Sequence, residues 1–202
     1  MIFPVNKRDL TVLAGIADGK KPGATSVVEV SYKAGTLTMS ATDAYIIAVV
    51  EQPGFTPEEV QKLDIDFESN YLSAESLRSV LKEIPRSKKI VYISIEGNKC
   101  EIVTDQNMYE VVMKNIHDDA LVSRYAKLRD DHRHIDEPTA CTVKSKVLAK
   151  AVKAAHELTY SEGMEFRVLK RANAPALQWT SARPDRGYAK VVTIAKYSFE
   201  VD

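Results

Sequence analysis

The chain has 202 residues, 45% of them apolar and 28% charged, so it is long enough to bury the core of one large domain or two small ones. Basic and acidic residues number 28 each, so no overall field points to a nucleic-acid partner and only the distribution of charge is informative. The two cysteines, Cys100 and Cys141, lie far apart and match no metal-binding spacing, which favours a reducing cytoplasm over a disulfide-stapled secreted fold. The stretch MIFPVNKRDL has no long apolar run, so we expect it to be neither a signal peptide nor a membrane span, and we expect no membrane partner.

The first elements are a short strand, a helix and three further strands. In NKRDLTVLAGIADG, apolar residues recur at the i, i+3, i+4, i+7 spacing of an amphipathic helix, at Leu10, Leu13, Ala14 and Ala17. The strand MIFPV precedes this helix, and the strands SVVEVSYKA, TLTMSAT and YIIAVVE follow it, with Gly35 in a turn.

The same succession appears twice more along the chain. The second helix, SAESLRSVLKEIP, begins at a capping Ser73, ends before Pro85 and carries the stripe Leu77, Val80, Leu81 and Ile84. The third helix, KSKVLAKAVKAAHEL, carries Leu148, Ala151, Val152 and Ala155. Their flanking strands are predicted in IDFESNYL, KIVYISIEG, KCEIVTD and MYEVVMK, and then in ACTV, MEFRVLK, ALQWTSA and AKVVTIAKYSF.

The sequence therefore predicts an α+β protein built from three strand–helix–strand–strand–strand units. We place these units at residues 1–63, 64–116 and 138–202, with the first two forming one complete domain and the third forming half of a domain. Residues 117–137 are a charged connector of the kind that joins domains.

The strand YIIAVV is apolar on both faces. Tyr45, Ile47 and Val49 point one way, and Ile46, Ala48 and Val50 point the other. A turn at Asp43 precedes this strand, because an aspartate side chain can bond the local backbone. One face of this strand can pack against the protein's own helices, so the other apolar face must be buried by something else.

The charges are segregated along the chain. Residues 51–68 hold six acidic side chains against Lys62 alone, whereas the second and third helices are basic on the side away from their apolar stripes. Rows of lysine without interleaved aromatic residues suit phosphate contact rather than base stacking, and a solvated helix face explains them equally well. The candidate DNA-binding residues are Arg78, Lys82, Arg86, Lys88, Lys89, Lys146, Lys150 and Lys153.

The chain contains no motif of a known enzyme class. Phosphate-binding loops, zinc-protease helices and nucleophile elbows are absent from the sequence, so we expect no catalysis and no cofactor. The histidines His117, His132 and His134, with the aspartates around them, imitate a metal site, but their place in a charged connector favours a solvated surface.

The stretch Ala41-Thr42-Asp43-Ala44-Tyr45-Ile46-Ile47-Ala48-Val49 resembles the A-T-D-G-H-R-L-A-V motif of the bacterial DNA polymerase III β subunit, the sliding clamp. The second helix and its strands resemble the rest of that family's middle domain. Residues 122–128 stand where the family has F-P-x-Y-x-x-[VL], and the chain from Thr139 onward resembles the first half of the third domain.

This resemblance implies a DNA-clamp fold: a ring whose helices line a central hole, through which duplex DNA passes without sequence preference. Such a ring tethers polymerases and is loaded by a clamp loader. The family also has a pocket for short apolar peptides of these partners, and the matching positions here are Thr42, Ala44, Tyr45, Ile46, Ile47, Lys127 and Leu128. Ala44, Tyr45 and Ile46 replace the family's glycine, histidine and arginine, and Val122 and Ser123 replace its phenylalanine–proline pair. Simple burial of Ile46, Ala48 and Val50 by a neighbouring sheet or subunit is the equal alternative.

Relative to the family, the chain lacks counterparts of the first domain and of the second half of the third. A lone third unit leaves an exposed sheet edge, so we expect it to pair with the third unit of another copy. Four chains then supply the twelve units of a ring, and a dimer is the smaller assembly. The alternative function is that of a clamp-like adaptor or decoy, which binds clamp partners without encircling DNA.

Overall fold

The computed structural model describes residues 2–17, 23–54, 67–116, 141–159, 164–169, 176–182, 187–194 and 196–197. The predicted connector 117–137, with its histidines and with Lys127 and Leu128, lies outside these residues. In chain order the described elements are β1 (Ile2–Asn6), α1 (Lys7–Ile16), η1 (Gly23–Ser26), β2 (Val27–Lys33), β3 (Thr36–Thr42), β4 (Ile46–Pro53), β5 (Phe67–Ser73), α2 (Ala74–Glu83), β6 (Ile90–Glu96), β7 (Lys99–Val103), β8 (Met108–Val111), β9 (Cys141–Thr142), α4 (Ser145–Thr159), β10 (Glu165–Leu169), β11 (Ala176–Ala182), β12 (Tyr188–Ile194) and β13 (Lys196–Tyr197).

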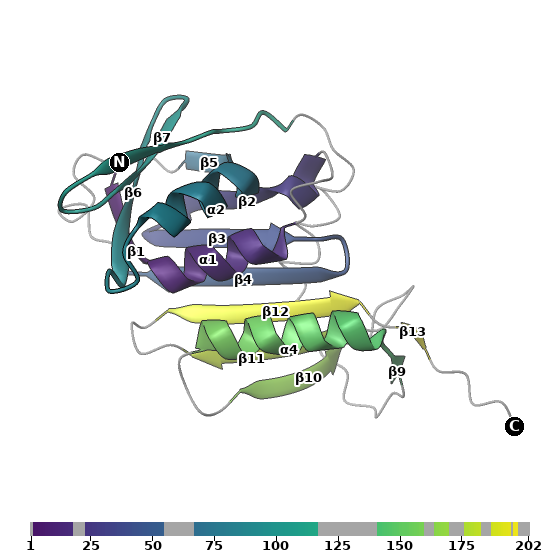
Figure 1. Ribbon diagram of the computed structural model, residues 1–202. Helices are drawn as coiled ribbons and strands as arrows, with labels where there is room; N and C mark the ends of the chain where they lie inside the picture. Colours follow the sequence, from purple (N-terminus) through teal and green to yellow (C-terminus); the bar gives the residue numbers. More distant parts are fainter. Residues whose placement is uncertain are drawn as a thin grey trace, which may run out of the picture.

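These elements confirm the three predicted strand–helix–strand–strand–strand units, and the first two units exchange their first strands. β1 of the first unit pairs with β6 of the second, and β5 of the second unit pairs with β2 of the first. The result is one four-stranded sheet, β1-β6-β7-β8, and one larger sheet in the order β10-β11-β12-β4-β3-β2-β5 (Figure 1). The third unit joins the larger sheet where β12 lies antiparallel to β4. All strand pairs in the described chain are antiparallel.

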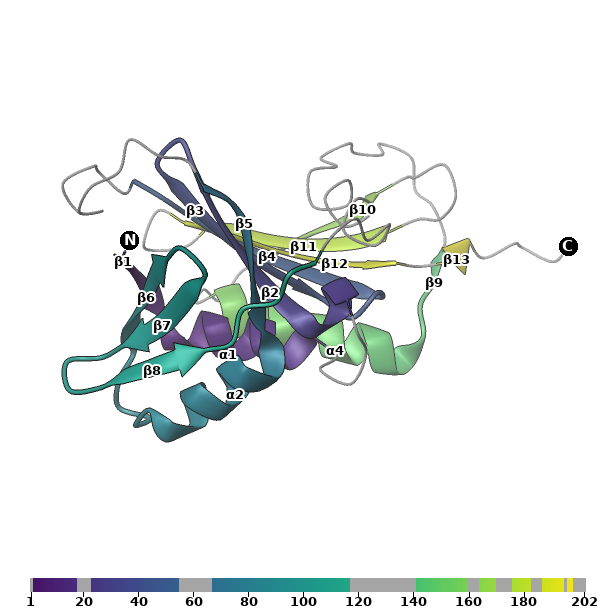
Figure 2. The same cartoon turned by 90° about the horizontal axis from the view of Figure 1, so that it is seen from above.

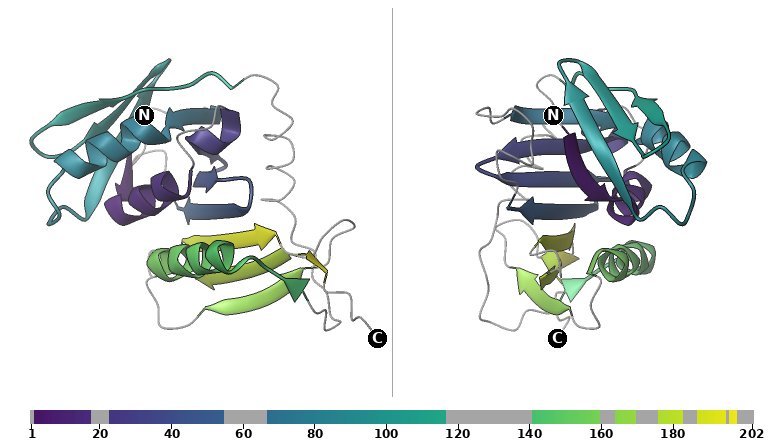
Figure 3. Two further views of the ribbon diagram at one scale, coloured as in Figure 1. Left: turned by 45° about the vertical axis from the view of Figure 1, so that its right-hand side comes forward. Right: turned by 90° about the vertical axis from the view of Figure 1, so that its left-hand side faces the viewer.

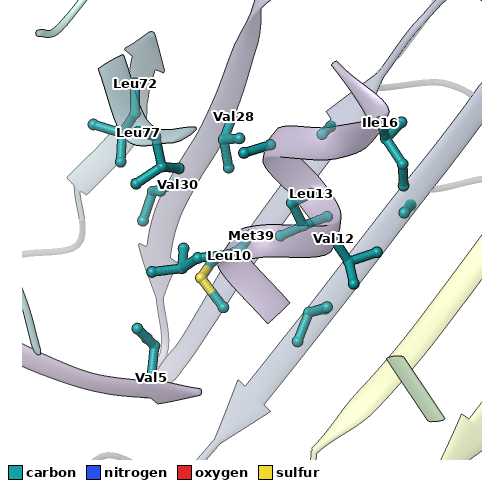
Figure 4. Packing of buried hydrophobic residues seen from close by; sticks show 14 of the residues in the cluster. Val5, Leu10, Val12, Leu13, Ile16, Val28, Val30, Met39, Leu72 and Leu77 are labelled. Atoms are coloured by element: carbon teal, nitrogen blue, oxygen red, sulfur yellow. The ribbon is translucent and has the colours of Figure 1, made fainter. Parts of the chain in front are cut away.

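The three α-helices of the described residues, α1, α2 and α4, lie on one side of the seven-stranded sheet (Figures 2 and 3). α1 packs between α2 and α4. Beneath α1, Leu10 and Leu13 meet Met39 of β3 and Val28 and Val30 of β2, and all five side chains are fully buried (Figure 4). This main cluster extends without a break from β6 and β7 to β11 and β12, so the helix side of the sheets holds the protein's core.

Local sequence explains where the helices begin. The Asn6 side chain accepts a hydrogen bond from the Arg8 amide, and the Ser73 side chain accepts one from the Ser76 amide, as N-cap residues do. The stripes predicted on the first two helices are buried as expected. Gly35 and Gly97 adopt positive φ angles in the hairpin turns that follow β2 and β6.

Two predictions about the third unit were wrong. Val152 was assigned to a buried stripe, but its side chain is 40% exposed, because no described helix packs on that side of α4. The run AKVVTIAKYSF was expected to be one strand, but it divides into β12 and β13, and β13 pairs with β9 rather than with the large sheet.

Candidate nucleic-acid interface

A basic groove of about 930 Å³ lies between α1 and α2. Its apolar lining includes Val12, Leu81 and Ile84, and among the described residues Glu157 is the one carboxylate that lines it. The side chains that give it charge all come from α1, α2 and the segment that follows α2: Lys7, Arg8, Arg78, Lys82, Arg86, Lys88 and Lys89. We call this the α1–α2 groove.

The sequence predicted five of these seven cations and missed Lys7 and Arg8. The two residues stand at the start of the first helix, which by itself is only weakly basic, so nothing in the sequence assigned them to the site. Their contribution depends on the antiparallel packing of α1 against α2. The Lys7 ammonium reaches the end of α2 and donates to the carbonyl oxygens of Ile84, at 2.6 Å, and Pro85, at 3.3 Å.

The positively charged side chains of the α1–α2 groove lie close to one another. Partial burial lowers the pKa of the Lys7 ammonium below its usual value, and the neighbouring Arg86 guanidinium lowers this pKa further. An anion bound in the groove would offset the repulsion between Lys7 and Arg86. Lys82, Arg86 and Lys89 are exposed, so they are available to such an anion.

Two of the predicted DNA-binding residues donate hydrogen bonds to the protein's own backbone. The Arg78 Nη1 atom donates to the carbonyl oxygens of Ala14, at 2.6 Å, and Ala17, at 3.1 Å. From the other side, the Lys150 ammonium donates to the carbonyl oxygen of Ile16 at 3.0 Å. Both cations thus sit at the C-terminal end of α1, where the unpaired carbonyls and the helix dipole favour positive charge.

The remaining predicted cations lie on the surface in different settings. Lys88 forms an ion pair with Asp105, which holds the pKa of that carboxyl below its usual value. On α4, Lys146 is exposed, and Lys153 is exposed with its ammonium 3.9 Å from the Glu157 carboxylate. These two lysines lie outside the α1–α2 groove, on the helix that flanks α1 on its other side.

The turn between β3 and β4 holds the residues predicted for a peptide pocket. The Asp43 carboxylate accepts hydrogen bonds from the amides of Tyr45, at 3.0 Å, and Ile46, at 2.9 Å, which confirms the predicted turn. The Thr42 hydroxyl, which is buried, donates to the Ile46 carbonyl oxygen at 2.8 Å and accepts from the Ala44 amide at 3.0 Å. Ala44 has a φ angle of +77°, in the region that favours glycine.

The predicted pocket residues separate into exposed and buried side chains. Tyr45 is 51% exposed, and the Lys144 ammonium lies 5.9 Å from the centroid of its ring. The Thr193 hydroxyl of β12 donates to the backbone carbonyl oxygen of Tyr45. Ile46 lies in the core beneath the helices, so it does not line a surface pocket. Ile47 is also buried and forms a small separate cluster with Val49 on the opposite face of the sheet.

No group of three or more histidine, cysteine or acidic side chains in the described residues is arranged to hold a metal ion. Among the described helices, none combines the length and apolar composition needed to cross a membrane.

Solved structures that resemble this chain include the DNA polymerase III subunit beta of Pseudomonas aeruginosa, with 11% identity and a TM-score of 0.49 over 100% of this chain and 66% of that one. The β subunit of Thermotoga maritima is similar at 12% identity and a TM-score of 0.49, with the same two coverages. The sliding clamp of Bacillus subtilis is similar at 14% identity and a TM-score of 0.48, over 98% of this chain and 50% of that one.

These relatives are bacterial sliding clamps. They belong to the family that the Ala41–Val49 motif resembles, and the chain spans about half to two thirds of their length. No family model and no curated protein matches the sequence.

Proposed function

We propose that this protein is a sliding-clamp-like factor that encircles duplex DNA as a homo-oligomer and tethers replication proteins to it. The observation that carries the proposal is the α1–α2 groove, where seven cations face a single carboxylate on the side of the sheets that holds all described helices. Point charges on flexible stems, without a recognition helix or exposed aromatic rows, suit phosphate contact that is independent of sequence.

The proposed protein performs no chemistry. A closed ring holds DNA by topology, so weak and exchangeable phosphate contacts are sufficient and allow sliding. Four copies, each with three units, would supply the twelve units of a ring.

Charge reversal in the groove tests the DNA role. The variant Lys82→Glu/Arg86→Glu changes two exposed groove residues whose side chains, unlike those of Arg78 and Lys150, donate to no carbonyl oxygen at the end of α1. The matched control, Lys33→Glu/Lys99→Glu, makes the same change of charge at two exposed lysines on strands. The binding constant is measured as a function of salt concentration. The slope of its logarithm against the logarithm of the salt concentration should become about two units shallower for the groove variant, because each lost phosphate contact removes about 0.9. Equal binding by the two variants would remove the groove from the DNA interface.

Retention on closed circular DNA and on linear DNA of equal length tests encirclement. A ring stays on the circle and slides off the free ends, so we expect a long residence only on the circle. Equal residence on both, or on neither, would favour the adaptor or decoy function.

The β3–β4 turn is proposed as part of a site for apolar peptides of polymerases and clamp loaders. Tyr45 carries this assignment, because it is a half-exposed aromatic side chain beside Lys144 where the first and third units meet. Tyr45→Ala should weaken binding of a polymerase-derived peptide about tenfold, as loss of an aromatic anchor does, whereas Tyr92→Ala on β6 should not. The same peptide affinity in both variants would exclude the turn.

A further inference from the structure

The third unit has the same parts as the first two, but no described strand pairs with its second strand in the way that completes the first two units. In the first two units the second strand is covered on its outer edge: β2 by β5, and β6 by β1. The third unit's second strand, β10, is the last strand of its sheet, and no described strand lies on its outer edge. β9 pairs with β13 on one edge over two residue pairs, and its other edge has no described partner.

The inward-facing side chains of β10 are more exposed than the corresponding side chains of β2 and β6. The inward-facing residues of the two covered strands, Val28 and Val30 in β2 and Val91 and Ile93 in β6, are all 0% exposed. On β10, Phe166 faces the core side, where its ring contacts Trp179, yet it is 52% exposed. A large aromatic residue that is half exposed on the core side of an edge strand offers apolar surface that a further protein contact would bury.

The helix of the third unit is open on the same side. Val152 is the eighth residue of α4, and the eighth residues of α1 and α2 are Ala14 and Leu81, which are 0% and 5% exposed where the two helices pack together. Val152 is 40% exposed. The third unit therefore combines a sheet edge without a described partner, the half-exposed aromatic side chain of Phe166 and the exposed helix residue Val152.

We infer that this surface binds the third unit of a second copy of this chain, so that two chains build one shared domain. The first two units already show how such a domain closes, since each gives its first strand to the other's second strand. The third unit carries both members of this exchange. A two-fold axis between two copies would place each copy's β9 beside the other's β10 and α4 beside α4, and an interface of this kind satisfies both open edges at once.

The shared domain would supply one of the contacts of the proposed ring, and only this link to a ring rests on the proposed function. The dimer itself is inferred from the strand pairing, so it can be tested without DNA. We would measure the mass of the full chain in solution across micromolar concentrations, for the wild type and for Phe166→Asp and Val152→Asp. Both positions are exposed in the single chain, and circular dichroism checks that the variants fold. Tyr92→Asp, at a 39% exposed residue of β6, is the matched control.

We expect the wild type and Tyr92→Asp to form a dimer or a larger even assembly, and each third-unit variant to associate at least about tenfold more weakly. A monomeric wild type, or equal association of all four proteins, would overturn the inference. Amide hydrogen exchange separates strand pairing from non-specific association. In the wild type the amides of β10 should exchange as slowly as those of β2, and in Phe166→Asp they should exchange faster. Fast exchange of the β10 amides in an associated wild type would also overturn the inference.

The result is distinguishable from that of the DNA experiments. A stable dimer that is not retained on circular DNA would refute the proposed function and leave the shared domain standing. If the wild type is retained on circular DNA but the third-unit variants assemble as well as the wild type, the shared domain would be refuted and the proposed function would stand.

Discussion

The Lys150 ammonium lies 2.6 Å from the Asp43 carboxylate and thereby joins the helix of the third unit to the β3–β4 turn of the first. The same ammonium donates to the Ile16 carbonyl oxygen at the end of α1. Asp43 is mostly shielded from solvent and also fixes the turn through the amides of Tyr45 and Ile46. A residue whose sequence pattern indicates DNA contact therefore has a structural role at the junction of two units.

Lys150→Met should lower the free energy of unfolding by about 1 kcal/mol, because it removes two charge-assisted hydrogen bonds from a half-exposed site and keeps the apolar stem. The control Lys153→Met removes only an exposed ion pair with Glu157 and should change stability by less than about 0.5 kcal/mol. Urea denaturation measures both. Equal losses in the two variants would show that Lys150 has no special role at the junction.

Ala44→Gly should stabilise the protein. Ala44 holds a φ angle of +77°, which costs an alanine about 1 kcal/mol and costs glycine little. Part of this gain is offset by the greater freedom of glycine in the unfolded chain, so we expect a net increase of about 0.5 kcal/mol in the free energy of unfolding. Ala41→Gly, in the neighbouring strand β3, should be destabilising and serves as the control. A loss of stability in Ala44→Gly would contradict the strained turn.

The repeating pattern of apolar residues was sufficient to predict the three units. The i, i+3, i+4, i+7 spacing placed all three helices, and the cap at Ser73 and the turn at Asp43 were predicted from side chains that bond their own local backbone. These features depend on contacts within a few residues, so a single sequence contains the information for them.

Features that depend on long-range packing were not predictable in the same way. The predicted lysines and arginines lie on α2, on α4 and on the segment after α2, but only the packing of α1 between α2 and α4 shows that Arg78 and Lys150 bind the end of α1. The strand YIIAVV was predicted to be apolar on both faces, and both Ile46 and Ile47 are buried, on opposite faces. The alternating pattern could not show that Ile46, from the same turn as the exposed Tyr45, is inaccessible to a peptide.

Asp105→Asn should strengthen DNA binding if the α1–α2 groove contacts DNA. Asp105 forms an ion pair with Lys88, which lines the groove, so loss of the Asp105 charge frees one groove cation and removes one carboxylate that would repel phosphate. The logarithmic salt slope should become steeper by about 0.9, the contribution of one phosphate contact.

The control for this change is Glu101→Gln, which breaks the ion pair with Lys99 on β7, outside the groove lining. It makes the same change of charge and should leave the salt slope unaltered. An equal gain in affinity from both variants would indicate a general charge effect rather than a contact made by Lys88.

The pH dependence of stability should carry a signal from Cys100. Burial raises the pKa of its thiol from 9.0 to about 12, and the nearby Glu101 carboxylate adds to this effect. Above pH 9 the unfolded chain therefore loses the thiol proton while the folded chain keeps it, so the contribution of Cys100 to stability falls as pH rises from 9 to about 12. Relative to Cys100→Ala, the wild type should lose about 1.4 kcal/mol of unfolding free energy per pH unit within this window. Denaturation of the two proteins at several alkaline pH values measures the difference, which should be constant below pH 8. A difference that does not narrow as pH rises would mean that water reaches the thiol and that the β7 side of the core is less tightly closed than its 0% exposure indicates.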